Sequence, residues 1–213
     1  MPGLTSRMTE HMNKGEENVC VGDFDFEFEL EPVREGQIRG YRGVAGAFGG
    51  VEVTTDLGAP GRAPSRQVAL IGARFPETLF SGGAGVSPSL DGGWLKVDGT
   101  IVDMDLKIKG LRKGSRWLEL TFRDRHYTYS VTGSAEDVRF SGDSATIATT
   151  RGRRVPVNSG CRMVKVQGDA DATDLAIALV LEEVDRSALS LTGALFALPR
   201  NVLFGRSRDE GLA

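Results

Sequence analysis

Apolar and polar residues alternate along much of this chain. Between Asp23 and Leu30, phenylalanine or leucine occupies every second position, and acidic residues occupy the positions between them. A period of two is typical of a β-strand that buries one face. Similar short runs recur at roughly 8–14 residue intervals, separated by Gly, Asp, Ser and Pro, which favours an antiparallel meander, barrel or sandwich. The further strands are expected at Gln37–Val44, Gly50–Thr55, Gln67–Ala73, Glu77–Phe80, Trp94–Val97, Ile101–Lys109, Trp117–Arg123, His126–Thr132, Val138–Phe140, Ala145–Thr150, Arg154–Val157 and Arg162–Gln167.

One segment near the C-terminus has a different pattern. Leu175–Leu181 is an uninterrupted apolar run, and Asp171, Thr173 and Asp174 precede it. We expect a helix over residues 173–184, because Thr173 can cap its first amides and the acidic residues suit the positive end of its dipole. A helix that is apolar on every side must be buried all round. The sequence therefore predicts a mainly β fold, an antiparallel β-barrel of about ten to twelve strands with one buried apolar C-terminal helix.

The length and composition suit one domain with loose ends. With 213 residues and 40% apolar composition, the chain is long enough for one substantial core. We expect a disordered leader or arm over 1–19, a single barrel domain over 20–200 and a flexible tail over 201–213. A second helix is expected at Ser187–Leu198, where Pro199 ends it.

Targeting signals and cysteine usage bear on where the protein works. The N-terminus shows no basic stretch followed by an apolar core, which predicts no secretory signal. No apolar run approaches the ~20 residues that a transmembrane helix needs. Cys20 and Cys161 are far apart in the sequence and favour a reducing compartment. We expect a cytoplasmic protein without a transmembrane segment.

Charge is distributed unevenly, although the net charge is only −3. Residues 107–165 hold 13 Lys/Arg against 5 Asp/Glu, and both flanking regions are acidic. Such asymmetry indicates either a surface for phosphates or anionic lipid, or basic strands paired with acidic ones inside the sheet. For each basic hairpin, the alternative to a binding surface is a solvated turn whose charges discourage pairing with another strand edge. The candidate anion-binding residues are Lys107, Lys109, Arg112, Lys113 and Arg116 around one turn, and Arg151, Arg153 and Arg154 around another.

Few residues indicate catalysis. His126 is the one imidazole outside the expected leader, and a lone histidine beside a turn is typical of a polar surface. Too few His and Cys residues lie in the expected domain for a metal site, and we expect no cofactor. Four aromatic residues, Trp94, Trp117, Tyr127 and Tyr129, either line a barrel lumen for an apolar ligand or fill the core. Nucleic acid is not an expected partner, because aromatic and basic residues are not interleaved.

The region from Trp117 to Arg186 resembles the end of a tubby-like barrel domain, of the LURP-one-related and phospholipid-scramblase type. The resemblance rests on the strand Arg125-His126-Tyr127-Thr128-Tyr129, on the short strand Ser144–Ala148, and on the acidic segment Gly168–Asp174 that leads into Leu175–Asp185. It implies a central helix threading a closed barrel of about twelve strands. It also implies a basic outer surface that binds anionic phospholipid head groups, often peripheral to a membrane. The scramblase's calcium-binding segment has no clear counterpart, and the helix expected after Arg186 departs from the pattern.

Three functions remain open at this point. The first is a non-catalytic tubby-like module that binds anionic lipid head groups or a protein partner through a basic surface. The second is a small barrel cyclase or isomerase that holds a hydrophobic small molecule in its lumen, since catalysis by positioning needs few polar groups. The third is a structural subunit of a larger assembly. The first two differ in the lumen, which is filled by the helix in one case and open in the other.

Overall fold

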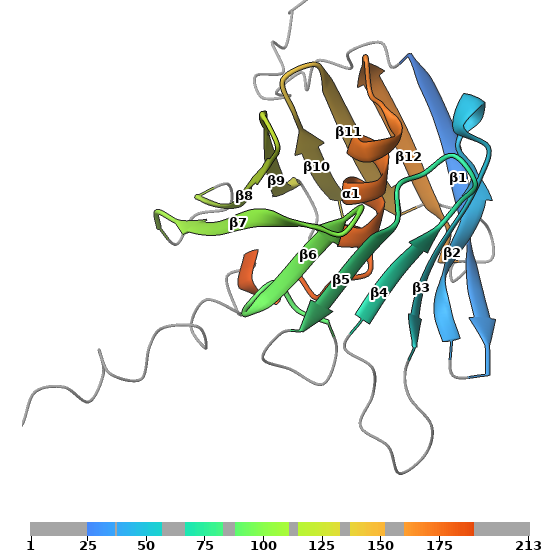
Figure 1. Ribbon diagram of the computed structural model, residues 1–213, viewed down its shortest axis with the longest axis horizontal. Coiled ribbons are helices and arrows are strands. Elements are labelled where there is room, and N and C mark those ends of the chain that lie inside the picture. The colour runs from blue at the N-terminus through green and yellow to red at the C-terminus, as the bar shows by residue number, and fades with distance from the viewer. Residues whose placement is uncertain are drawn as a thin grey trace, which may run out of the picture.

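Twelve strands close into a barrel around a helix in the computed structural model (Figure 1). The structure describes residues 25–36, 38–56, 67–82, 88–110, 115–132, 137–151 and 160–189. The strands are β1 (Phe26–Glu35), β2 (Ile38–Val44), β3 (Gly50–Asp56), β4 (Gln67–Ile71), β5 (Thr78–Gly82), β6 (Gly93–Val97), β7 (Thr100–Ile108), β8 (Arg116–Phe122), β9 (Arg125–Thr132), β10 (Asp137–Ser141), β11 (Ala145–Arg151) and β12 (Arg162–Gly168). The helices are α1 (Ala172–Glu182) and the short 3₁₀ turns η1 (Gly46–Phe48) and η2 (Ser187–Leu189).

Each strand pairs antiparallel with the next one along the chain, and β1 closes the ring by pairing with β12. In that closing pair Phe28 lies opposite Val164, so two inward apolar residues meet at the seam. The predicted fold class, an antiparallel barrel with one buried helix, is confirmed. The expected strand Arg154–Val157, the expected leader over 1–19 and the expected tail over 201–213 lie outside the described residues. Of the helix expected at Ser187–Leu198, the structure describes only its beginning, which is the 3₁₀ turn η2.

The helix α1 occupies the interior of the barrel (Figure 1). All residues from Asp174 to Glu182 are buried, and Leu175, Ile177, Val180 and Leu181 have no exposed surface. The helix packs against β4, β5 and β11. Barrels of about eight strands are filled by their own side chains, and a larger ring encloses more space. An all-round apolar helix suits that space, because α1 is buried on every side.

The start of α1 differs from the expectation in its capping residue. Asp171, not Thr173, is the N-cap, and its Oδ1 accepts from the amides of Thr173 at 2.8 Å and Asp174 at 3.0 Å. The carboxylate of Asp174 accepts in return from the amide of Asp171 at 3.0 Å. This reciprocal arrangement is a capping box, which satisfies amides that the first turn leaves without intrahelical partners.

The placement of α1 predicts a contrast between two isoleucines. Ile177→Ala removes a fully buried side chain from α1 and should lower the free energy of unfolding by about 2–5 kcal/mol. Ile101→Ala, on the outer wall of β7 where the side chain is 65% exposed, should change it by less than about 0.5 kcal/mol. Urea unfolding followed by circular dichroism measures both. Equal losses would contradict a helix that fills the lumen.

Candidate functional site

Two of the four aromatic candidates, Tyr127 and Tyr129, lie inside the barrel and are hydrogen-bonded to α1. The hydroxyl of Tyr127 donates to Oδ1 of Asp174 at 2.8 Å, and the hydroxyl of Tyr129 donates to the carbonyl of Leu181 at 3.2 Å. Burial, followed for Tyr127 by its hydrogen bond to Asp174, raises the pKa of both phenols, so they stay protonated donors. The two tyrosines therefore contact opposite ends of the helix, which lies where an open lumen would have to be.

The other two aromatic candidates lie on the outer wall. Trp94 on β6 is 38% exposed, and Lys96 Nζ lies 5.4 Å from the centroid of its ring. Trp117 on β8 is half-buried and donates through Nε1 to Oε1 of Glu119 at 2.9 Å. Both tryptophans alternate with inward leucines on their strands. The expectation that they line a lumen is therefore corrected.

The N-terminus of α1 is tied to the start of β9 by an ion-pair network. Arg125 Nη1 donates to Oδ2 of Asp171 at 2.6 Å and to Oδ1 of Asp174 at 3.1 Å. Asp174 is thereby shared between Arg125, Tyr127 and the capping box. The acidic segment before the helix thus holds α1 against β9. This structural role explains why the segment is acidic, and no catalytic role is needed to explain it.

The C-terminus of α1 meets a group of buried and part-buried charges that we name the arginine cluster: Arg39, Arg162 and Arg186 around Glu182 and Glu183. Arg186 Nη1 lies 3.4 Å from each carboxylate oxygen of Glu182. Arg162 Nε lies 3.8 Å from Oε2 of Glu182, and Arg39 Nε lies 3.8 Å from Oε2 of Glu183. Burial raises the pKa of both carboxyls, and the arginine charges oppose that shift.

Sequence reasoning missed this cluster, although the strand pattern contained a signal. Arg162 shares its parity with Val164 and Val166, which are fully buried. A cation at an inward position of an alternating strand must meet a counter-charge or a ligand. The counter-charge was visible in the sequence too, because Glu182 and Glu183 lie at the end of a helix that is expected to be buried.

The eight basic candidates do not form one surface among the described residues. Lys107 pairs with Asp105 and lies 3.5 Å from Oε2 of Glu119, and Lys109 Nζ lies 4.8 Å from the ring centroid of Trp117. Arg116 is only 4% exposed and shares the inward face of β8 with its leucines, so its assignment to an outer basic surface is corrected. Arg112, Lys113, Arg153 and Arg154 lie outside the described residues, as does the side chain of Arg151, whose backbone pairs with Arg162.

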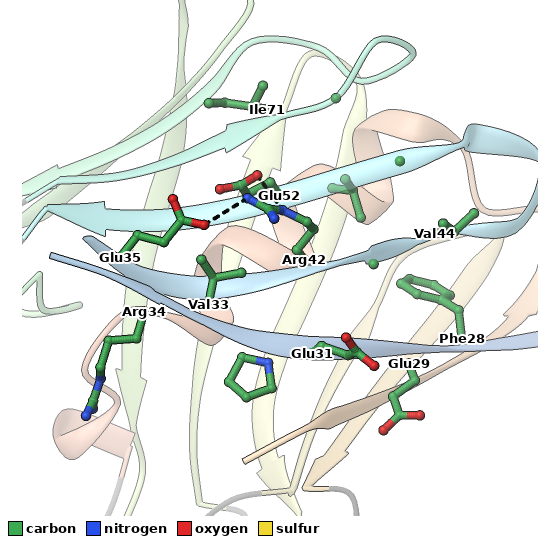
Figure 2. Close-up of a pocket in the computed structure, with 15 residues that line it drawn as sticks. Phe28, Glu29, Glu31, Val33, Arg34, Glu35, Arg42, Val44, Glu52 and Ile71 are labelled. Atoms are coloured by element: carbon green, nitrogen blue, oxygen red, sulfur yellow. Dashed lines mark hydrogen bonds and ion pairs between the residues drawn. The ribbon is translucent and has the colours of Figure 1, made fainter. Parts of the chain in front are cut away.

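A groove crosses the outer wall of β1–β4 (Figure 2). It has a volume of about 1080 Å³. Its exposed apolar side chains include Val44 and Ile71, each 65% exposed. The charged residues at its edge are Glu29, Glu31, Glu35, Glu52, Arg34 and Arg42. Within the groove Arg42 pairs with Glu52 at 2.9 Å and with Glu35 at 3.7 Å, whereas Arg34 points away from this pair (Figure 2).

Glycines in β2 allow the close strand packing beneath the groove. A Cβ at Gly40 would lie 1.8 Å from the carbonyl oxygen of Val53, and a Cβ at Gly43 would lie 2.4 Å from that of Glu29. No side chain fits at either distance, so β2 approaches both neighbours only because these positions are glycine. The pairing then aligns Glu31, Arg42, Glu52 and Ile71 in one row across the four strands.

No group of three or more His, Cys, Asp or Glu residues in the described ranges is arranged to hold a metal ion. Within those same ranges, no helix combines the length and the apolar character that crossing a bilayer requires.

The capping network predicts a stability loss that depends on pH. Burial alone would raise the pKa of Asp171, but hydrogen bonds from the Asp174 amide and the Arg125 guanidinium hold it below its ordinary value of 3.8. The charge of Asp171 therefore stabilises the fold above that value, and the contribution disappears as the pH falls through the lowered one. At pH 7 we expect Asp171→Ala to cost about 0.5–2 kcal/mol. Asp171→Asn should cost less, because asparagine retains the cap.

Urea unfolding of the three proteins between neutral and acid pH tests both parts. The difference between the wild type and Asp171→Asn should shrink toward zero in acid, where the aspartate is neutral too. A difference that stays constant down to acid unfolding would contradict the role given to the Asp171 charge.

Comparison with known proteins does not identify the chain: no family model, curated protein or solved structure matches it. The tubby-like resemblance thus remains a prediction. The lumen, the arginine cluster, the outer wall and the groove are the features of the described residues that bear on function.

Proposed function

We propose that this protein is a non-catalytic binding module of the tubby-like kind, which recognises a protein partner on its outer wall. The observation that carries the proposal is the helix in the lumen. Since α1 is buried on all sides and hydrogen-bonded at both ends to tyrosines of β9, the helix occupies the place where a substrate would lie in an open lumen. Recognition is then left to the outside of the barrel.

The same observation weakens the cyclase hypothesis. That hypothesis needs aromatic residues around an open lumen, but Tyr127 and Tyr129 bond to α1 while Trp94 and Trp117 lie on the outer wall. Asp174 and Arg186, the charged groups hydrogen-bonded to these tyrosines, are also engaged in ion pairs with Arg125 and Glu182. The described aromatic residues therefore do not form the ring around a lumen that a positioning enzyme of this kind needs.

The groove over β1–β4 is the binding surface that we assign to the partner. Its four glutamates outnumber its two arginines, and exposed Val44 and Ile71 provide apolar contact area. This combination complements a segment that carries both basic and apolar side chains. Every strand in the described ring is paired on both sides, so the partner cannot bind by adding a strand to a free edge. Side-chain contacts must provide the affinity.

This proposal predicts binding of a synthetic peptide with alternating lysine and leucine residues. Ile71→Ser removes an apolar contact in the groove and should weaken the peptide's affinity about tenfold or more, because a buried isoleucine contributes about 1.5–3 kcal/mol. Ile101→Ser is the matched control, because Ile101 is equally exposed but lies on β7. Fluorescence anisotropy of the labelled peptide measures both.

The control and the salt dependence decide the result. Ile101→Ser should bind as the wild type does, and raising the salt concentration should weaken binding, since the glutamates attract the lysines through screened charges. No saturable binding, or an equal loss in both variants, would argue against the groove as the partner's site.

A second candidate, anionic lipid binding, is favoured by the tryptophans on β6 and β8. Each of them has a lysine ammonium near its ring, Lys96 for Trp94 and Lys109 for Trp117. Tryptophan suits the boundary between lipid and water, and lysine is attracted to anionic head groups. The pairs of Lys107 with Asp105 and Glu119 reduce the positive charge of this wall. For that reason we place the lipid second.

The lipid candidate predicts sedimentation of the protein with vesicles of phosphatidylcholine and phosphatidylserine, but not with phosphatidylcholine alone. Lys96→Gln and Lys109→Gln should each reduce the bound fraction as expected for about a fivefold loss of affinity, because one lysine near the surface contributes about 1 kcal/mol. Lys165→Gln, on β12, is the control. Equal binding to both kinds of vesicle, or a loss for all three variants alike, would exclude this wall as a lipid surface.

A further inference from the structure

The arginine cluster holds more hydrogen-bond donors than its carboxylates accept. The side chain of Arg162 is only 7% exposed, yet its Nε and Nη1 donate no hydrogen bond to any described residue. The Nε of Arg39 is also buried and donates none. The separations of 3.8 Å to Glu182 and Glu183 give charge attraction but exceed hydrogen-bond length. Buried donors that are left without acceptors destabilise a fold.

The donors of Arg39 and Arg162 converge on one place. Tyr41 lies two residues beyond Arg39 on the same face of β2, and the guanidinium carbon of Arg162 lies 5.3 Å from the centroid of its ring. Arg39 Nε lies 3.8 Å from Oε2 of Glu183, and Arg162 Nε lies 3.8 Å from Oε2 of Glu182. Since these two glutamates are consecutive, the two guanidinium groups approach adjacent carboxylates, one from β2 and the other from β12.

The charges of the cluster leave room for one more anion. Three arginines face two carboxylates, and Glu182 is the one that Arg186 engages, through both of its oxygens. Arg186 is further engaged by the Tyr129 hydroxyl, 3.3 Å from its Nη1. Arg39 and Arg162 are thus the members with donors to spare. Their nearest carboxylates, Glu182 and Glu183, oppose a second anion, so the site depends on the donors that the two arginines leave unused.

We propose that the arginine cluster is a binding site for a phosphate group, held between Arg39 and Arg162 beneath the C-terminus of α1. A phosphate suits these donors because its several oxygens accept from two guanidinium groups at once, in the forked geometry that arginine favours. Arg39 gives the site its access, since its side chain is 41% exposed while its Nε is buried. This site goes beyond the proposed function, because Arg39 and Arg162 do not line the groove.

The phosphate group has two possible sources, a soluble phosphate compound or the head group of a lipid. Both present the same oxygens to the cluster. Because Arg162 is buried, the phosphate must project past Arg39 to reach it. The experiment therefore includes one arm for each source.

The test is isothermal titration calorimetry of the full chain with inorganic phosphate at constant ionic strength. We expect saturable binding by the wild type and at least a tenfold weaker affinity for Arg39→Gln, which removes a partly exposed side chain and so should leave the fold intact. Arg139→Gln, an exposed arginine on β10, is the matched control and should bind as the wild type does. Arg162→Lys keeps the positive charge but removes the forked pair of guanidinium donors, and it should also weaken binding at least tenfold.

The second arm uses sedimentation with vesicles that contain phosphatidic acid. Vesicle binding that is lost in Arg39→Gln but retained in Arg139→Gln supports the cluster with a lipid source. Phosphate binding without vesicle binding supports the cluster with a soluble source. The proposal is overturned if the wild type binds neither probe, or if Arg39→Gln and Arg139→Gln behave alike in both arms. Peptide binding in the groove would be unaffected by either result.

Discussion

The structure depends on filling a ring of twelve strands with a single helix. A ring of this size encloses more space than its own inward side chains occupy, and an empty apolar interior would forfeit the contacts that stabilise a core. The helix α1 provides those contacts while satisfying its own backbone hydrogen bonds, which an irregular segment could not do. The apolar run at Leu175–Leu181 and the closure of β1 on β12 are therefore parts of one solution.

The polar contacts at the two ends of α1 position the helix along the barrel axis. Acidic residues at its start meet Arg125 and Tyr127, and glutamates at its end meet arginines from β2, β12 and the segment after the helix. Apolar packing alone would permit the helix to slide or rotate, because its sides are alike. The polar ends define one position, which is a recognised use of buried polar groups.

The architecture was predictable from the sequence because the spacing of apolar residues along each segment indicates its type of secondary structure and which of its faces are buried. Alternation showed the strands, and seven consecutive apolar residues indicated a helix with no solvent face. The positions of the site residues were harder to predict, because the polarity of a side chain and its place in the alternation of the strand pointed to opposite faces. In β8, Trp117 is expected inside the barrel, at a lumen or in the core, and Arg116 on a basic surface, but parity with Leu118 and Leu120 puts Arg116 inside and Trp117 outside. The groove was not predictable, because it arises from the register of four strands and from glycines in β2.

The closing pair also determines when the molecule can fold. Phe26 pairs with Val166, and the helix that fills the ring follows β12 in the chain. Pairing between residues so distant in sequence makes folding slow. During synthesis β1 cannot pair with β12 until nearly all the barrel has left the ribosome. Until α1 follows, the inward faces of the earlier strands are not covered by the helix. Incomplete chains would expose unpaired strand edges and apolar surface, the features that lead to aggregation and chaperone binding.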